Sequence, residues 1–190
     1  MNRKSFFTAS IIFTALVALS IWSGLVWAHF HGGVSSHHLL ADEKLPALSN
    51  WWGALILPLL TWFLLYRIRE NTFREEGHSS LLRPLYGFIG AVLFGGLISV
   101  LFTLGENDLA GNAMLLLFVA ALVYPVYRPE CLLGFVLSMS YVFGPVLPAL
   151  IGILVGGIAL VLYALVRPAG QYVAAKLALV ISFSNARHKD

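Results

Sequence analysis

The residues of this 190-residue chain that could do chemistry gather in one short segment. Four of the six histidines fall within ten positions, and two carboxylates follow them: His29, His31, His37, His38, Asp42 and Glu43. Neutral imidazole and carboxylate groups are the ligands that suit zinc, copper(II), nickel and iron(II). The pattern therefore predicts a divalent transition-metal site formed by the four histidines and Asp42. Glu43, with Glu106 and Asp108 further along the chain, could supply additional ligands.

Local spacing favours convergence of these side chains. In an extended segment His29 and His31 point the same way, because side chains alternate along a strand. A helix over residues 35–45 would place His38 and Asp42 on one face. Two other roles stay open for the histidines, because imidazole tolerates a membrane interface and an exposed histidine can sense pH near neutrality.

The segment at residues 31–41, HGGVSSHHLLA, resembles the histidine segment of the nickel permeases that accompany hydrogenase and urease. Those proteins are small and have a leader and several membrane spans, so the resemblance implies metal transport. It covers only these residues. The segment departs from that family where the family has His-Pro and Asp-His, because this chain has His-Gly and His-His instead.

The composition identifies the kind of protein that must position these residues. Apolar residues make up 59% of the chain and charged residues 11%, and the mean hydropathy is +0.84. A soluble domain is about 25% charged, so a soluble globular domain, a disordered chain and a coiled coil are excluded. A disulfide scaffold is excluded because Cys131 is the single cysteine. These values predict a polytopic membrane protein.

We expect an all-α fold: a single domain forming a bundle of about six transmembrane helices. Each span needs about 20 apolar residues. The expected spans are 5–27, 48–66, 84–104, 111–127, 131–145 and 147–166. The last two belong to one uncharged run, which Gly144, Pro145 and Pro148 divide. Residues 169–184 are expected to form an amphipathic helix on the inner membrane surface rather than a seventh span.

The basic residues predict the orientation of the spans. With both termini inside, eleven of the twelve lysines and arginines lie on the cytoplasmic side, and only Lys44 lies outside. We therefore expect a multi-pass protein of a bacterial-type inner membrane. The net charge of +3 then reflects the orientation of the spans in the membrane. The expected partner is the lipid bilayer, and binding of nucleic acid is not expected. Tryptophans near 22–27 and 51–52 fit the outer interface, where Ser49 or Asn50 could cap the second span.

The first span could be a leader, because Val26-Trp27-Ala28 fits the small-residue rule for cleavage. The apolar run is about 23 residues, however, and a leader's apolar region is about 7–15. We therefore expect an uncleaved helix. Cleavage would free an amine at His29, and an amine beside imidazole would favour copper.

Small residues recur on two spans. Gly87, Ala91, Gly95 and Ser99 follow each other at every fourth position, and Gly152 and Gly156 repeat the spacing. Such stripes let helix backbones approach closely in a membrane. We expect packing within one protomer. The alternative is an interface with a second copy or with a partner in a membrane complex.

Three functions fit these observations. The favoured one is handling or transport of a divalent metal ion through the outer histidines. The second is a membrane enzyme that uses the metal to act on a lipid or apolar substrate, with one of the nearby carboxylates as base. The third is a structural or assembly subunit without chemistry of its own. Enzymatic activity is the less favoured reading, and a serine hydrolase in particular has no motif support, because no Gly-x-Ser-x-Gly sequence is present.

Overall fold

The computed structural model describes residues 2–31, 33, 36–38, 47–74, 81–168, 172 and 176. This part of the chain forms helices α1 (Arg3–Phe30), α2 (Gly53–Phe73), α3 (Leu82–Thr103), α4 (Asn107–Val123), α5 (Pro129–Phe143) and α6 (Val146–Val161). Strands β1 (Ser36–His38) and β2 (Ala47–Ser49) pair antiparallel. A 3₁₀ turn, η2 (Asn50–Trp52), leads into α2, and a π-helical turn, η3 (Leu162–Val166), extends α6. The fold is thus helical, with one small strand pair added to what the sequence predicts.

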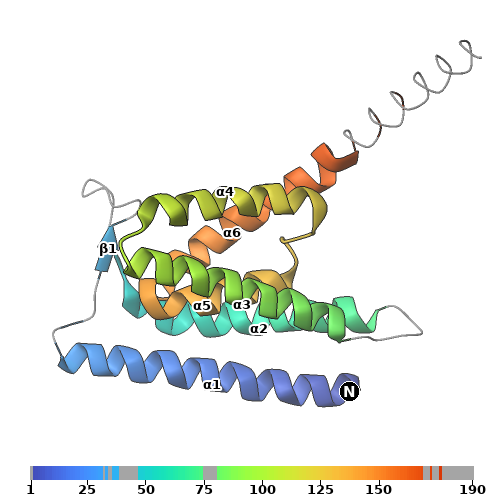
Figure 1. Cartoon of the computed structure of the whole chain (residues 1–190). Helices are drawn as coiled ribbons and strands as arrows, with labels where there is room; N and C mark the ends of the chain where they lie inside the picture. Colours follow the sequence, from blue (N-terminus) through green and yellow to red (C-terminus); the bar gives the residue numbers. More distant parts are fainter. Residues whose placement is uncertain are drawn as a thin grey trace, which may run out of the picture.

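The helices run back and forth along the bundle, so their ends gather at two opposite ends of the molecule (Figure 1). We call one the arginine end, where α1 begins, α2 ends and α3 and α5 begin. Its arginines are Arg3, Arg67, Arg69, Arg74, Arg83 and Arg128. We call the opposite one the histidine end, where α1 ends beside the strand pair. The turns between α3 and α4 and between α5 and α6 lie there too.

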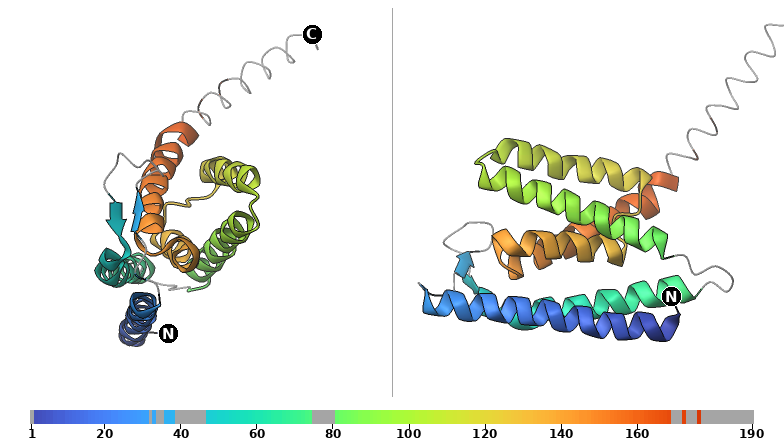
Figure 2. Two further views of the ribbon diagram at one scale, coloured as in Figure 1. Left: turned by 90° about the vertical axis from the view of Figure 1, so that its left-hand side faces the viewer. Right: turned by 60° about the horizontal axis from the view of Figure 1, so that its bottom comes forward.

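Helix α5 forms the centre of the bundle. Eight of its fifteen residues are buried, against two of the 28 residues of α1. At about 1.5 Å per residue α5 is roughly 22 Å long, which is shorter than the roughly 30 Å apolar layer of a bilayer. The helix is surrounded mainly by other helices. Figure 2 shows α1 and α4 at opposite sides of the bundle.

The small-residue stripes of α3 and α6 both pack against α5. A Cβ atom added to Gly95 would collide with the hydroxyl of Ser138, and one added to Gly134 would lie 2.5 Å from the Phe88 carbonyl oxygen. On the α6 side, a Cβ at Gly152 would lie 2.8 Å from a Val136 methyl group. The predicted packing within one protomer is therefore confirmed, with α5 as the partner of both stripes.

Four of the described helices are long and apolar enough to cross a membrane: α1, α2 with its leading turn, α3, and α6 with η3. Helices α4 and α5 are apolar but have only 17 and 15 residues. The fourth segment was expected to reach residue 127, and this is wrong. Helix α4 ends at Val123 because Tyr124 is extended and Pro125 follows it. The expected amphipathic helix at 169–184 lies outside the described residues, apart from Tyr172 and Lys176.

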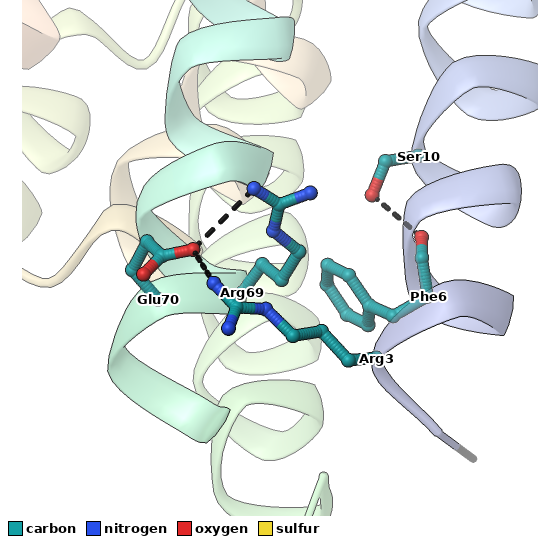
Figure 3. A network of polar contacts seen from close by, with 5 residues as sticks. All are labelled: Arg3, Phe6, Ser10, Arg69 and Glu70. Atoms are coloured by element: carbon teal, nitrogen blue, oxygen red, sulfur yellow. Dashed lines mark hydrogen bonds and ion pairs between the residues drawn. The ribbon is translucent and has the colours of Figure 1, made fainter. Parts of the chain in front are cut away.

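Helix α1 lies antiparallel along α2 and is attached to it near both ends. At the arginine end Arg3 donates to Glu70 Oε1 at 2.6 Å, and Arg69 donates to the same oxygen at 3.3 Å (Figure 3). Toward the histidine end, the indole of Trp22 donates to the Ala54 carbonyl at 2.9 Å. The residues of the possible cleavage site, 26–28, lie inside α1. That this helix is not cleaved stays a prediction.

Candidate functional site

The two histidines at the end of α1 face aromatic rings. His29 lies in the last turn of α1, with its ring centroid 6.0 Å from that of Trp51. The ring of His31 stacks on Trp27 at 3.8 Å, and its Nδ1 lies at hydrogen-bond distance, 3.0 Å, from the Trp27 carbonyl oxygen. The extended arrangement considered for His29 and His31 does not form, because the helix runs on to Phe30. The helix stops where Gly33, with φ +93°, donates its N–H back to the Ala28 carbonyl.

The second histidine pair lies on a strand. In β1 the backbone of His37 pairs with Leu48 and that of His38 with Ala47. The helix suggested for residues 35–45 is therefore wrong at these positions. Asp42 and Glu43 lie outside the described residues.

The remaining candidate ligands occupy the turn between α3 and α4. Glu106 precedes α4 without a side-chain cap, and Asp108 lies in the first turn of that helix. Both are exposed, and a carboxylate in the first turn interacts favourably with the helix dipole. Among the described residues, no three His, Cys, Asp or Glu side chains are close enough to hold a metal ion. Metal binding therefore stays a prediction from the sequence.

The arginine end contains a cavity that the sequence did not reveal. Its volume is about 780 Å³, and it lies between α2, the start of α3, the start of α5 and the end of α6. We call it the basic cup, after the arginines that line it: Arg67, Arg74, Arg83 and Arg128. Guanidinium groups bind phosphate and carboxylate through paired N–H donors. Four of them around one cavity favour an anionic ligand.

One buried carboxylate balances part of this charge. Glu130 is 3% exposed and lies in the first turn of α5, where the helix dipole favours a negative charge. Its Oε1 is 3.7 Å from a guanidinium nitrogen of Arg128. The described lining of the cup therefore holds four positive charges and one negative charge, and its field attracts anions.

A second cavity of about 330 Å³ adjoins the cup. We call it the apolar cavity, and α3, α4, α5 and α6 enclose it. Its walls are mainly apolar side chains and glycines: Gly87, Gly90, Ala91, Phe94, Leu117, Leu132, Phe135, Gly152, Val155 and Gly156. Leu132 lines both cavities. The volume lies at the lower end of the range for small-molecule sites, roughly 300–1,000 Å³.

The border between the two cavities lies at Gly87. A Cβ atom there would be 3.0 Å from Glu130 Cγ, 3.1 Å from the Tyr124 hydroxyl and 3.3 Å from Cys131 Sγ. The Tyr124 hydroxyl is a neutral polar group at physiological pH. Polar groups thus end the apolar cavity on the side that faces the cup.

Sequence reasoning predicted neither cavity. It interpreted the arginines as topology signals and the glycines as packing residues, and it did not single out Glu130. A carboxylate at the first turn of an otherwise apolar helix, two residues after an arginine, was the one available signal. The chain matches no protein-family model, no curated protein and no solved structure.

Proposed function

We propose that this protein binds an anionic amphiphile, a lipid-like molecule with a phosphate-type headgroup, in its two adjoining cavities. The observation that carries this proposal is that Leu132 forms a wall of both the basic cup and the apolar cavity. A headgroup among the arginines would leave its hydrocarbon chain beside the glycine-lined walls. One molecule with a charged end and an apolar end satisfies both cavities at once.

The proposal includes a membrane orientation. The four long apolar helices are typical of a membrane protein, and the excess of arginine at one end follows the positive-inside rule. The arginine end therefore faces the cytoplasm, and both termini lie inside. The basic cup then sits at the level of the inner-leaflet headgroups, with the apolar cavity reaching into the hydrocarbon layer. We assign the protein to a bacterial-type inner membrane on the same grounds, as a bundle of about six spans.

Dodecyl phosphate and dodecyl maltoside test the proposal, because they share a chain and differ in headgroup charge. The purified protein in a neutral detergent should bind dodecyl phosphate measurably and be stabilised by it. Added dodecyl maltoside should neither bind measurably nor stabilise the protein. Isothermal titration calorimetry and thermal unfolding provide the two readouts. Equal responses to the two compounds would contradict an anionic site.

Two glycine variants test whether the hydrocarbon chain of the ligand enters the apolar cavity. A Cβ atom at Gly90 or at Gly96 meets nothing within 4 Å, but only Gly90 lines the cavity. Gly90→Leu should fill the cavity and weaken binding of dodecyl phosphate by about tenfold, because roughly two chain methylenes lose their apolar contacts. Gly96→Leu, on the same helix, should leave binding unchanged. Equal affinities for the two variants would show that the chain does not enter this cavity.

A second candidate function is metal handling at the histidine end. Pairing of β1 with β2 brings residues 36–38 beside 47–49, just before Trp51, whose ring contacts His29. The strand pair that contains His37 and His38 therefore leads directly into the turn whose Trp51 contacts His29. This supports a site for zinc, copper, nickel or iron there, with the metal as cargo or as ligand.

A further inference from the structure

A third cavity lies toward the histidine end. Its volume is about 500 Å³, and it lies between α1, the start of α2 and the end of α5. Four side chains with polar groups line it among apolar residues and glycines: Ser20, Asn50, Ser140 and Tyr141. We call it the histidine-end cavity. It is large enough for a hydrated headgroup and offers hydroxyl and amide groups to bind one.

The basic cup and the histidine-end cavity lie on the same helix pair. Leu64 of α2 and Leu132 of α5 line the cup, whereas Leu57 of α2 and Leu137 of α5 line the histidine-end cavity. Leu57 and Leu64 are separated by two helical turns, or roughly 10 Å. The contact between α2 and α5, which we call the α2–α5 seam, therefore connects a cavity at one end of the bundle with a cavity at the other.

Thr61 lies on this seam between the two cavities. The buried face of α2 carries Leu57, Thr61 and Leu64 at positions i, i+4 and i+7, so Thr61 lies between the two lining leucines. Its side chain is 0% exposed, and its hydroxyl has no hydrogen-bond partner within the described part of the chain. A buried hydroxyl without a partner is costly to a folded protein.

Three hydroxyls elsewhere in the bundle behave differently, although Thr14 on α1, like Thr61, has no partner among the described residues. Ser99, Thr103 and Ser140 each donate to the carbonyl four residues earlier in their own helix, which is the usual arrangement in membrane helices. Thr61 does not. A polar group that stays unsatisfied midway between two cavities fits a site that a passing headgroup uses.

We infer that the α2–α5 seam is the route along which the headgroup of the amphiphile crosses the bundle, so that the protein moves an amphiphile between the two leaflets. This inference rests on the proposed function. In the structure described here apolar side chains close the seam, with Leu57 and Val136 in one buried cluster and Leu64 and Leu133 in the next. Passage therefore requires α2 and α5 to separate, while Thr61 offers the headgroup a hydrogen bond midway between the two cavities.

Reconstitution into vesicles tests this route. The full chain would be placed in phosphatidylcholine vesicles that contain a trace of NBD-labelled phosphatidylglycerol, and dithionite added outside would quench each label that reaches the outer leaflet. The wild type should accelerate the second, slow phase of quenching over protein-free vesicles. Thr61→Val keeps the shape of the side chain and removes the hydroxyl. It should slow this phase about tenfold, the usual effect of losing one hydrogen bond to a charged group, while dodecyl phosphate binding and thermal stability are retained.

Thr14→Val is the matched control. The hydroxyl of Thr14 is also buried without a partner in the described residues, but Thr14 lies on α1, which does not line the basic cup. This variant should keep the wild-type rate. Wild-type rates for both variants, or equal slowing of both, would overturn the route through Thr61. A wild-type protein that binds dodecyl phosphate yet leaves the quenching rate unchanged would overturn transport and leave the proposed function standing. A wild-type protein that does not bind dodecyl phosphate would overturn the proposed function itself.

Discussion

The two ends of the bundle differ in what their residue types suggest and in what the packing of the helices forms there. The histidine end has the residue types that suggest chemistry, yet His29 and His31 contact aromatic rings, and Glu106 and Asp108 are exposed. The arginine end has residues that a membrane protein carries for topology alone, yet Arg67, Arg83 and Arg128 line one cavity. Residue type predicted a site at one end, and the packing of distant helices builds a cavity at the other.

The largest effect is expected from reversing charge at the arginine end. The double variant Arg67→Glu/Arg83→Glu should weaken dodecyl phosphate binding more than a hundredfold, since it replaces two attractive contacts, each worth about 1.5–3 kcal/mol, with repulsive ones. Calorimetric titration measures the change.

The matched control removes charge at the histidine end. Glu106→Gln/Asp108→Asn changes exposed carboxylates far from the cup and should leave the affinity within about twofold, because exposed charges contribute little. An equal loss of binding in this control would mean that the anionic ligand is not bound specifically at the arginine end.

A second prediction concerns α5, which runs from the arginine end to the histidine end through the centre of the bundle (Figure 1). Gly134→Val would force a side chain against the Phe88 carbonyl oxygen, 2.5 Å from the position of the added Cβ. Overpacking of this kind costs about 1–3 kcal/mol, so the midpoint of thermal unfolding should fall clearly. Gly157→Val is the control, because a Cβ there meets nothing within 4 Å. Similar midpoints for the two variants would argue against α5 as the tightly packed centre.

Metal content tests whether the histidine end is also a binding site. If the histidine end is also a site, the wild type should retain about one equivalent of zinc, copper, nickel or iron after loading and desalting. Replacing His29, His31, His37 and His38 by alanine should abolish this binding, as mass spectrometry of the metal would show. Equal metal content in the two proteins would remove the metal hypothesis and reduce these histidines to interfacial residues.

The smallest effect is expected at the attachment of α1. Arg3→Gln removes the hydrogen bond to Glu70, but this ion pair is exposed to solvent, and exposed pairs contribute little to stability. The unfolding midpoint should fall only slightly, and dodecyl phosphate binding should stay the same, because Arg3 does not line the cup. A large loss of stability would mean that α1 depends on this single contact.

The sequence predicted the helical bundle because hydropathy and glycine spacing are local signals. Apolar runs marked the helices, and the four-residue spacing of Gly87, Ala91 and Gly95 marked a face that packs closely against α5. The ends of helices were harder to predict. Nothing between Trp27 and the following glycines stops α1, so the helix continues through His29 instead of giving way to an extended segment.

The basic cup could not be predicted from local signals. Arg67, Arg83 and Arg128 come from three separate parts of the chain, and only the packing of α2, α3 and α5 brings them together. The positive-inside rule alone explains why arginines are found at this end, so their presence in the sequence does not indicate a second role. Glu130 is buried among them only because α5 begins inside the bundle rather than at its surface.

Native mass spectrometry of the intact protein, released from a neutral detergent after extraction from its membrane, tests the central claim most directly. We expect a stoichiometric adduct whose mass and fragmentation identify an amphiphile with an acidic headgroup, present in the wild type and absent in Arg67→Gln/Arg83→Gln. A wild-type protein that carries no adduct, or that carries neutral and acidic lipids in the proportions of the membrane, would contradict a specific anionic site at the arginine end.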